Sequence, residues 1–348
     1  MSQYPSNMYI RQSSRSQVWI YVVSILLVLA GAGVVFYVYR IGYSKRGTES
    51  VVSKSSAGKE AKTITSRTSV KSDREKSGLS LAPAAENTAP SASEAVGAEK
   101  LIAEAMACIN SNQPKIIEAR DRLNEVLAMP LNRQRRKFVK EQLSGLYDKW
   151  LYVRTVFPED KLCSSYKVQP GDLLSAIGKR FNVPYELLMK INKISRPEAL
   201  RSGEVIKIVN GPFHARVSRS GFTMDLFLKN TFVCSFPVGL GKPGMETPTG
   251  LWSVKTDGKM IKPIWTDPIT GRTYHPDAPD YPLGTRWIAL DGIGGTAVGR
   301  QGFAIHGTKD PNQIGSPTSQ GCIRLHNENA EFVYDLLMPG VSHVEVVE

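Results

Sequence analysis

Cysteine is scarce in this chain, because its 348 residues contain only four, Cys108, Cys163, Cys234 and Cys322. If Cys322 serves chemistry, an odd number remains, which argues against a framework of disulfide bonds. Cys108 and Cys234 have apolar neighbours and are predicted to be buried thiols, whereas Cys163 lies on a linker. Cysteine usage therefore leaves the redox compartment open.

The sequence lacks the usual signals of nucleic-acid binding and of metal binding. The formal net charge is +12, but basic and aromatic residues do not alternate as they do in nucleic-acid-binding modules, so we expect no nucleic-acid partner. Cys322 and His326 have the spacing of two zinc ligands, yet no further ligand types cluster beside them in the sequence. We therefore expect neither a metal nor a cofactor.

Long apolar runs are also few, and one stands out near the N-terminus. After a polar tail at residues 1–17, residues 18–39 are apolar and carry no charge. As a helix this run would span roughly 33 Å, which is enough to cross the hydrocarbon core of a bilayer. The run predicts an uncleaved, single-pass anchor in the cell membrane. A buried core helix and a signal peptide cleaved near Ala30–Ala32 are the alternatives.

Residues 40–92 are rich in serine, lysine and alanine and show no sustained hydrophobic period. This composition predicts a disordered linker with a reach of roughly 40 Å. Two basic residues precede the predicted anchor and five follow it. The positive-inside rule taken alone would place the C-terminal part in the cytoplasm.

Residues 93–160 show apolar positions three and four apart, in three stripes interrupted near Asn112 and at Pro130. This spacing predicts a small bundle of three short helices. Pro114 suits the first turn of the second helix. The bundle is either a spacer or a docking unit, and the spacing does not decide between them.

The stretch from Gly302 to Asn327 contains the candidate catalytic residues. Phe303–Ile305 reads as a short strand that ends at His306, and Cys322 follows Gly321 after a polar loop. A histidine close to a cysteine can act as its base and lower the pKa of the thiol. A glycine beside the cysteine gives a substrate carbonyl room and leaves backbone N–H groups free for an oxyanion. The alternative is a buried thiol and a surface imidazole without catalytic roles.

The string Ser-Gln-Gly-Cys-Ile-Arg, sixteen residues after a histidine-glycine pair, resembles the signature of L,D-transpeptidases with a YkuD-type domain. The resemblance runs from about Phe213 to the C-terminus. It implies a cysteine nucleophile, a histidine base, and a main-chain carbonyl just after the histidine that orients its ring. Carried over, these positions and the matching Ser and Arg are Cys322, His306, Gly307, Gly321, Ser319 and Arg324. Gln320 departs from the family, since many members have a second histidine there.

Two further strings fit this domain. Thr247–Trp252 matches a second family string, a tight turn that enters a strand of the sheet. The long, proline-rich stretch from Pro263 to Gly284 resembles the lid that covers the cleft in this family. Tyr274 and Tyr281 either line a groove for substrate or attach the loop to the sheet.

Residues 166–209 follow the order strand, helix, helix, strand, and they resemble a LysM domain over their whole length. LysM domains bind polymers that contain N-acetylglucosamine, in a groove between two loops. The resemblance places those loops here near Gly171, Asp172 and Leu173, and near Ile194. Asp172 could instead cap the first helix.

Together these patterns predict a multidomain chain with a transmembrane helix at 18–39, a disordered linker at 40–92 and a helical spacer at 93–160. A LysM module at 165–210 and a mainly-β L,D-transpeptidase catalytic domain at 212–348 follow. The resemblance implies cross-linking of peptidoglycan stem peptides through a cysteine thioester. The expected partners are glycan strands, stem peptides and the bacterial membrane. We expect the catalytic domain in the periplasm or cell-wall space, against the local charge count.

Three other functions remain open at this point. The chain could bind the wall through the LysM module without catalysis. It could also use the same acyl-transfer chemistry as an L,D-carboxypeptidase, or to attach a protein to the wall. Because the acceptor decides between transfer and hydrolysis, the residues named above do not separate these outcomes.

Overall fold

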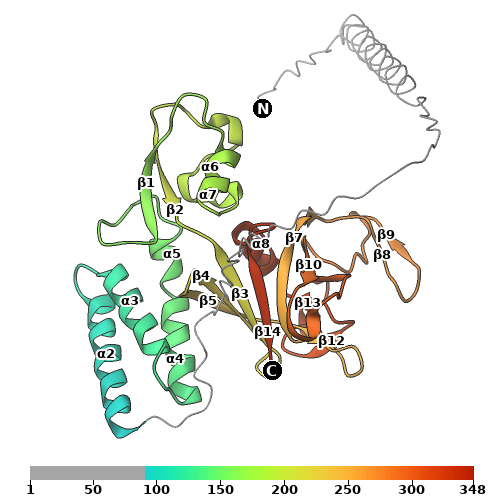
Figure 1. Ribbon diagram of the computed structural model, residues 1–348, viewed down its shortest axis with the longest axis horizontal. Helices are drawn as coiled ribbons and strands as arrows, with labels where there is room; N and C mark the ends of the chain where they lie inside the picture. The colour runs from blue at the N-terminus through green and yellow to red at the C-terminus, as the bar shows by residue number, and fades with distance from the viewer. Residues whose placement is uncertain (1–90) are drawn as a thin grey trace, which may run out of the picture. The chain divides into compact units, whose positions relative to one another are not determined.

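A computed structural model describes residues 91–348 (Figure 1). The chain divides into two units, Met1–Glu75 and Lys76–Glu348, and the described residues belong to the second. The predicted tail and membrane anchor, and almost all of the predicted linker, lie outside the described residues. From residue 91 onward, no helix is long and apolar enough to cross a membrane.

Four helices form the first part of the described chain. They are α2 (Ala92–Asn110), α3 (Ile116–Leu127), α4 (Arg133–Ser144) and α5 (Tyr147–Trp150). A capping box of Ser91 and Glu94 begins α2, because each side chain bonds the backbone N–H of the other. The expected place of Pro114 is wrong, because α3 is capped by Lys115 and the proline precedes the helix.

The next segment has the predicted strand-helix-helix-strand order. Its elements are β1 (Cys163–Lys167), α6 (Leu174–Arg180), α7 (Tyr185–Asn192), the short helix η1 (Pro197–Ala199) and β2 (Val205–Val209). Strands β1 and β2 pair antiparallel. The Asp172 carboxylate accepts hydrogen bonds from the Tyr166 hydroxyl at 2.7 Å and the Gln169 N–H at 2.8 Å. It therefore fixes the turn before α6, whose N-cap, Leu173, provides no side-chain cap.

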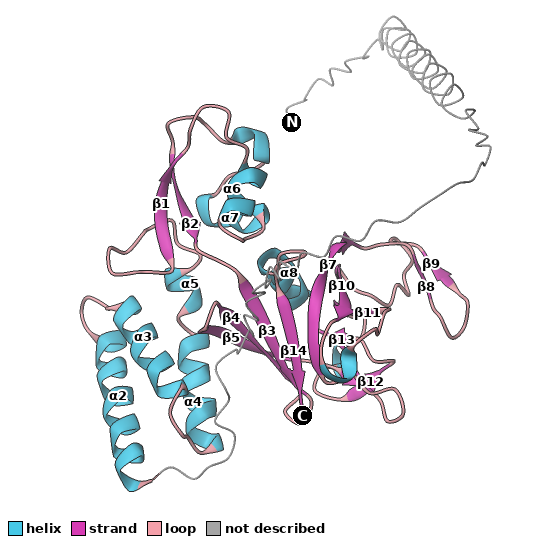
Figure 2. Ribbon diagram, in the orientation of Figure 1, coloured by secondary structure: helices cyan, strands magenta, loops and turns pink. Residues whose placement is uncertain are grey.

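The rest of the chain is built on a mixed eight-stranded sheet in the order β13-β11-β10-β7-β14-β3-β4-β5 (Figure 2). In chain order its strands are β3 (Phe213–Ser218), β4 (Thr223–Leu228), β5 (Thr231–Pro237), β7 (Gly250–Ile261), β10 (Arg286–Gly292), β11 (Phe303–His306), β13 (Ile323–Arg324) and β14 (His343–Val347).

Smaller elements surround this sheet. Two short pairs are β6 (Leu240–Gly241) with β12 (Pro317–Ser319), and β8 (Trp265–Thr266) with β9 (Thr273–Tyr274). The helices are η2 (Gly295–Ala297), η3 (Pro311–Gln313) and α8 (Asn327–Leu336), and α8 packs against β10 and β11.

Helices α3 and α4 pack against β5, the strand at one edge of this sheet. Strand β5 is an edge strand, and the Asn124 amide of α3 bonds both backbone groups of Phe232 on it. Its Oδ1 accepts from the Phe232 N–H at 2.7 Å, and its Nδ2 donates to the Phe232 carbonyl at 3.3 Å. The Ser144 hydroxyl accepts from the Ser235 N–H at 3.3 Å. An uncovered edge strand is a template for aggregation, and these contacts cover the edge at β5.

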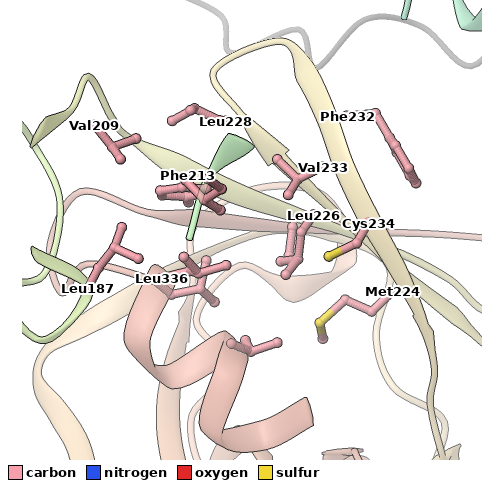
Figure 3. Close-up of a cluster of buried hydrophobic side chains, with 14 of the residues drawn as sticks. Leu187, Val209, Phe213, Met224, Leu226, Leu228, Phe232, Val233, Cys234 and Leu336 are labelled. Atoms are coloured by element: carbon pink, nitrogen blue, oxygen red, sulfur yellow. The ribbon is translucent and has the colours of Figure 1, made fainter. Parts of the chain in front are cut away.

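The strand-helix-helix-strand segment shares a hydrophobic core with the sheet and with α8. Figure 3 shows Leu187 of α7 and Val209 of β2 beside Phe213 of β3 and Leu336 of α8. The fully buried Lys207 of β2 joins the same segment to the helices. Its ammonium donates to the carbonyls of Trp150, Val153 at 3.0 Å and Thr155 at 3.1 Å. A buried charge needs such partners, because it has lost its water.

Replacing Asn124 tests how much the covered edge contributes. We expect Asn124→Ala to lower the free energy of unfolding by about 1–3 kcal/mol, because it leaves the N–H and C=O of Phe232 without partners. It should also raise the rate of aggregation on storage. Urea unfolding and light scattering measure the two effects. Asn112→Ala is the control, since Asn112 is exposed, and equal losses for both variants would contradict the role of Asn124.

Candidate active site

The sheet brings His306 and Cys322 into neighbouring positions. His306 is the last residue of β11, and Cys322 immediately precedes β13. The two strands pair in parallel, with Ile305 opposite Ile323 and His306 opposite Arg324. On its other side, β11 pairs with β10, so that Trp287 lies opposite His306 and stacks on its ring at 5.6 Å between centroids.

A tight turn presents Cys322, and one buried hydroxyl holds it. The Ser319 hydroxyl donates to the Cys322 carbonyl at 2.6 Å and accepts from the Gly321 N–H at 3.0 Å. The Gly321 N–H, one of the expected oxyanion donors, is therefore already paired. Within residues 91–348 the Cys322 N–H makes no hydrogen bond, which leaves it as the free donor of this turn.

Two features of the fold select glycine at position 321. Its φ of +113° lies in the region that favours glycine. A Cβ at this position would also lie 2.7 Å from Cε1 of Phe303, whose ring packs on Trp252 at 4.9 Å between centroids. The expected room for a substrate carbonyl beside Gly321 stays a prediction.

The His306 ring is buried and held by its neighbour's main chain. Its Nδ1 lies 2.6 Å from the Gly307 carbonyl, the expected contact. Because a carbonyl only accepts, Nδ1 carries the proton and Nε2 has the free lone pair of a base. Burial lowers the pKa of His306 to about 4, and the charge of Arg324 adds to this effect. The carbonyls of Gly307 and Leu283 oppose it.

Cys322 and His306 do not form an ion pair at rest. Burial raises the pKa of the Cys322 thiol, although the Ala304 N–H and the charge of Arg324 act in the opposite direction. Burial therefore outweighs the contributions that lower this pKa, and the directions of the two shifts favour a neutral thiol and a neutral imidazole. In the described part of the chain no hydrogen bond joins them, and the sulfur instead donates to the Gly302 carbonyl at 3.8 Å.

Arg324 fixes the loop that precedes the cysteine. Its Nη1 donates to the Gln313 side-chain oxygen and, at 3.5 Å, to the Thr318 carbonyl. Its backbone exchanges two hydrogen bonds with Gly239, at 2.8 and 2.9 Å. Its Nε is buried and has no partner among the described residues.

The proline-rich stretch contains a hairpin that the sequence did not predict. Strands β8 and β9 pair, and Trp265 stacks on Tyr274 at 5.9 Å between centroids. Tyr281 is only 6% exposed and its hydroxyl donates to the Pro263 carbonyl at 2.5 Å, so it attaches the loop and cannot line an open groove. The Ile269 N–H chiefly lowers the pKa of Asp267 between β8 and β9, and a hydrogen bond from the Gln320 side chain adds to this effect, which links the hairpin to the cysteine turn.

The residues expected to bind glycans divide into two groups. Leu173 is 66% exposed and follows the open turn at Gly171, where a Cβ would have no other atom within 4 Å. Ile194 is 9% exposed and lines cavities of about 580 and 610 Å³ that Gly171, Asp172 and Leu173 do not line. In these two cavities Ile194 and the Gly171 turn are therefore not brought together.

Two polar residues of the site, the buried Thr247 and the partly buried Asn327, carried no predicted role. Thr247 is 2% exposed, and its hydroxyl donates to the Gly321 carbonyl at 2.8 Å. The Asn327 amide bonds both backbone groups of Thr308 and accepts from the Thr285 N–H, which fixes the chain after His306. Among residues 91–348, no three His, Cys, Asp or Glu side chains gather as metal ligands.

Comparisons with known proteins agree with this layout. The model of the L,D-transpeptidase catalytic domain of YkuD type matches residues 212–346, and the LysM domain model matches residues 166–209. The candidate L,D-transpeptidase YkuD of Bacillus subtilis (strain 168) is 30% identical over 172 residues, which cover 47% of this chain and 88% of that protein.

Two further similarities are more distant. The candidate L,D-transpeptidase ErfK/SrfK of Escherichia coli (strain K12) is 28% identical over 200 residues, 54% of this chain and 56% of that protein. A solved structure of L,D-transpeptidase 3 from Mycobacterium tuberculosis is 22% identical with a TM-score of 0.31, covering 42% of this chain and 66% of that one. A TM-score of that size is too low to support an argument. On the family model and the relative from Bacillus subtilis, the chain belongs to the YkuD-type L,D-transpeptidase family.

Proposed function

We propose that this protein cross-links peptidoglycan, with Cys322 as the nucleophile and His306 as its base. One observation carries the proposal. Strand β13, which begins directly after Cys322, pairs in register with the strand that ends at His306, and the Gly307 carbonyl holds the ring so that Nε2 is unprotonated. A cysteine presented beside a fixed, neutral imidazole is suited to acyl transfer.

The reaction begins with transfer of the thiol proton from Sγ to Nε2 of His306, as the sulfur turns from the Gly302 carbonyl and attacks a peptide carbonyl of the donor stem. The S–C bond forms and the carbonyl oxygen becomes an oxyanion, which the Cys322 N–H receives. The C–N bond to the terminal D-alanine then breaks, and His306 returns its proton to the leaving amine. The amine of a second stem attacks the thioester, forms the new amide and releases the thiol.

The order of these steps predicts an unusual pH dependence. His306 must be neutral to accept the thiol proton, and burial lowers its pKa to about 4. We therefore expect kcat/KM for acylation to stay level as the pH falls through 6.5 and to decline only towards about pH 4. An ordinary imidazole would cause half the loss near pH 6.5. Circular dichroism should show that the protein is folded at each pH at which a rate is measured. This control is needed because burial also lowers the pKa of His214 to about 4, so that His214 titrates in the same range. An acid limb near pH 6.5 in folded protein would contradict the role of buried His306.

We further propose that residues 166–209 hold the enzyme on glycan strands through the exposed turn at Gly171 and Leu173. Leu173→Asp should reduce sedimentation of the protein with insoluble peptidoglycan. Val96→Asp is the matched control, because Val96 is also exposed, at 70%, but lies on α2. Equal sedimentation of the two variants would show that this turn is not part of the binding surface.

We propose that the catalytic domain lies outside the cytoplasmic membrane, in the periplasm or cell-wall space, with residues 18–39 as its anchor. Cross-linked wall exists only on that side, and translocated long domains override a modest excess of basic residues. Protease added to intact spheroplasts is expected to release a soluble fragment that contains Cys322. Protection of this fragment until the membrane is lysed would show the opposite orientation.

Incubation with defined muropeptides separates transfer from hydrolysis. A tetrapeptide donor with an acceptor stem should give a cross-linked dimer and free D-alanine, identified by mass. Release of D-alanine with a shortened monomer alone would identify a carboxypeptidase that uses the same acyl-enzyme. No release of D-alanine would contradict the proposed chemistry.

A further inference from the structure

Three of the four backbone groups around the peptide bonds of Gly321 and Cys322 are fixed by two buried hydroxyls. Ser319 holds the Gly321 N–H and the Cys322 carbonyl. Thr247 holds the Gly321 carbonyl at 2.8 Å and accepts from the Gly241 N–H at 3.1 Å. The fourth group, the Cys322 N–H, has no hydrogen-bond partner among residues 91–348.

The Gly321 carbonyl and the Cys322 N–H belong to one peptide unit. In a planar trans peptide these two groups point in opposite directions. The contact that holds the carbonyl against Thr247 therefore also directs the N–H away from Thr247. A glycine with φ of +113° lacks the side chain that would restrict rotation of this unit, so the direction of the N–H depends on the hydroxyl.

Thr247 has the rigidity that this task requires. Its side chain is buried at 2% exposure, and its hydroxyl is fixed from two sides, as acceptor from Gly241 and donor to Gly321. Gly241 itself approaches closely, since a Cβ there would lie 2.1 Å from the Met245 carbonyl. The segment 241–247 is thus a folded support beneath the cysteine turn.

We propose that Thr247 is a positioning residue that orients the Cys322 N–H toward the oxyanion formed during acylation. The inference rests on the proposed cysteine acyl-enzyme. Thr247 touches neither the sulfur nor a substrate, and it acts only through the Gly321–Cys322 peptide. Its loss should slow steps that form an oxyanion and spare the reactivity of the thiol in a step that forms none.

The test compares two reactions of Cys322. p-Nitrophenyl acetate transfers its acetyl group to the sulfur through an oxyanion and releases p-nitrophenol, whereas iodoacetamide alkylates the sulfur and releases iodide without one. For Thr247→Val we expect acylation at Cys322 to slow about tenfold to a hundredfold, somewhat less than the roughly 10²–10³ caused by loss of an oxyanion donor. Alkylation should stay within about twofold of wild type, and Thr247→Ser should restore acylation.

Thr249→Val is the matched control, because Thr249 lies in the same loop but its hydroxyl faces Thr296 at 3.1 Å; both rates should remain at wild-type values. Melting temperatures establish that each variant is folded. Equal slowing of acylation and alkylation in Thr247→Val, or no slowing of acylation, would overturn the positioning role. Because neither reagent is a stem peptide, these outcomes are separate from failure of the wild-type protein to cross-link muropeptides.

Discussion

Cys322→Ala abolishes acyl-enzyme formation and cross-linking while the protein stays folded. The side chain is half-buried just before β13, where the sulfur donates to the Gly302 carbonyl, and the change to alanine removes a single heavy atom. Loss of a nucleophile that begins the reaction should reduce turnover by several orders of magnitude, on the order of 10⁴–10⁶ by comparison with other covalent catalysts. A carbapenem, which acylates members of this family, should add mass to the wild type and not to the variant.

The other cysteines provide the controls for this experiment. Cys108→Ala should keep its full mass adduct, because Cys108 lies on α2 at a distance in sequence and fold from the turn. Burial raises the pKa of Cys163 to about 12, and it raises the pKa of Cys234 well above the ordinary value. Both are therefore poor nucleophiles. An adduct on either of them in Cys322→Ala would show that the assignment of the nucleophile is wrong.

Arg120→Met lowers the free energy of unfolding by about 3–5 kcal/mol, because it leaves a buried carboxylate without its counter-charge. The Arg120 guanidinium lies 2.9 Å from Oδ1 of Asp160, and the two residues are 2% and 6% exposed. The Arg120 guanidinium also stacks over the Trp150 ring, 4.6 Å from its centroid. The pair joins α3 to the chain just before β1, so the loss should appear in the stability of both segments.

Urea unfolding followed by tryptophan fluorescence measures this loss. Arg120→Met with Asp160→Asn should lose less than Arg120→Met alone, since the unpaired charge is then absent. Arg122→Met is the control on the same helix, because Arg122 is one-third exposed and solvent screens its pairs with Glu104 and Glu118. Similar losses for Arg120→Met and Arg122→Met would refute the account of the buried pair.

Local patterns predicted most of the elements that build the site. The apolar run Phe303–Ile305 became β11, and the strand-helix-helix-strand order of residues 166–209 became β1, α6, α7 and β2. These elements are set by periodicity within a few residues, which is visible in a single sequence. The hairpin of β8 and β9 was not predicted, because each of its strands has only two residues and lies among prolines.

Contacts between distant residues could not be predicted in this way. Thr247 and Gly321 are 74 residues apart, and Asn124 and Phe232 are 108 apart. Lys207, which sequence alone would place at the surface, is buried because three carbonyls happen to converge on it. The pKa directions of Cys322 and His306 likewise depend on burial, and burial follows from the whole fold rather than from the motif.

The intact mass of the protein, quenched early in its reaction with a stem tetrapeptide, tests the central claim most directly. We expect the protein to gain the mass of the donor without its terminal D-alanine, and we expect peptide mapping to place this acyl group on Cys322. An acyl group on any other residue would contradict the account. So would turnover of the donor without any covalent adduct on Cys322.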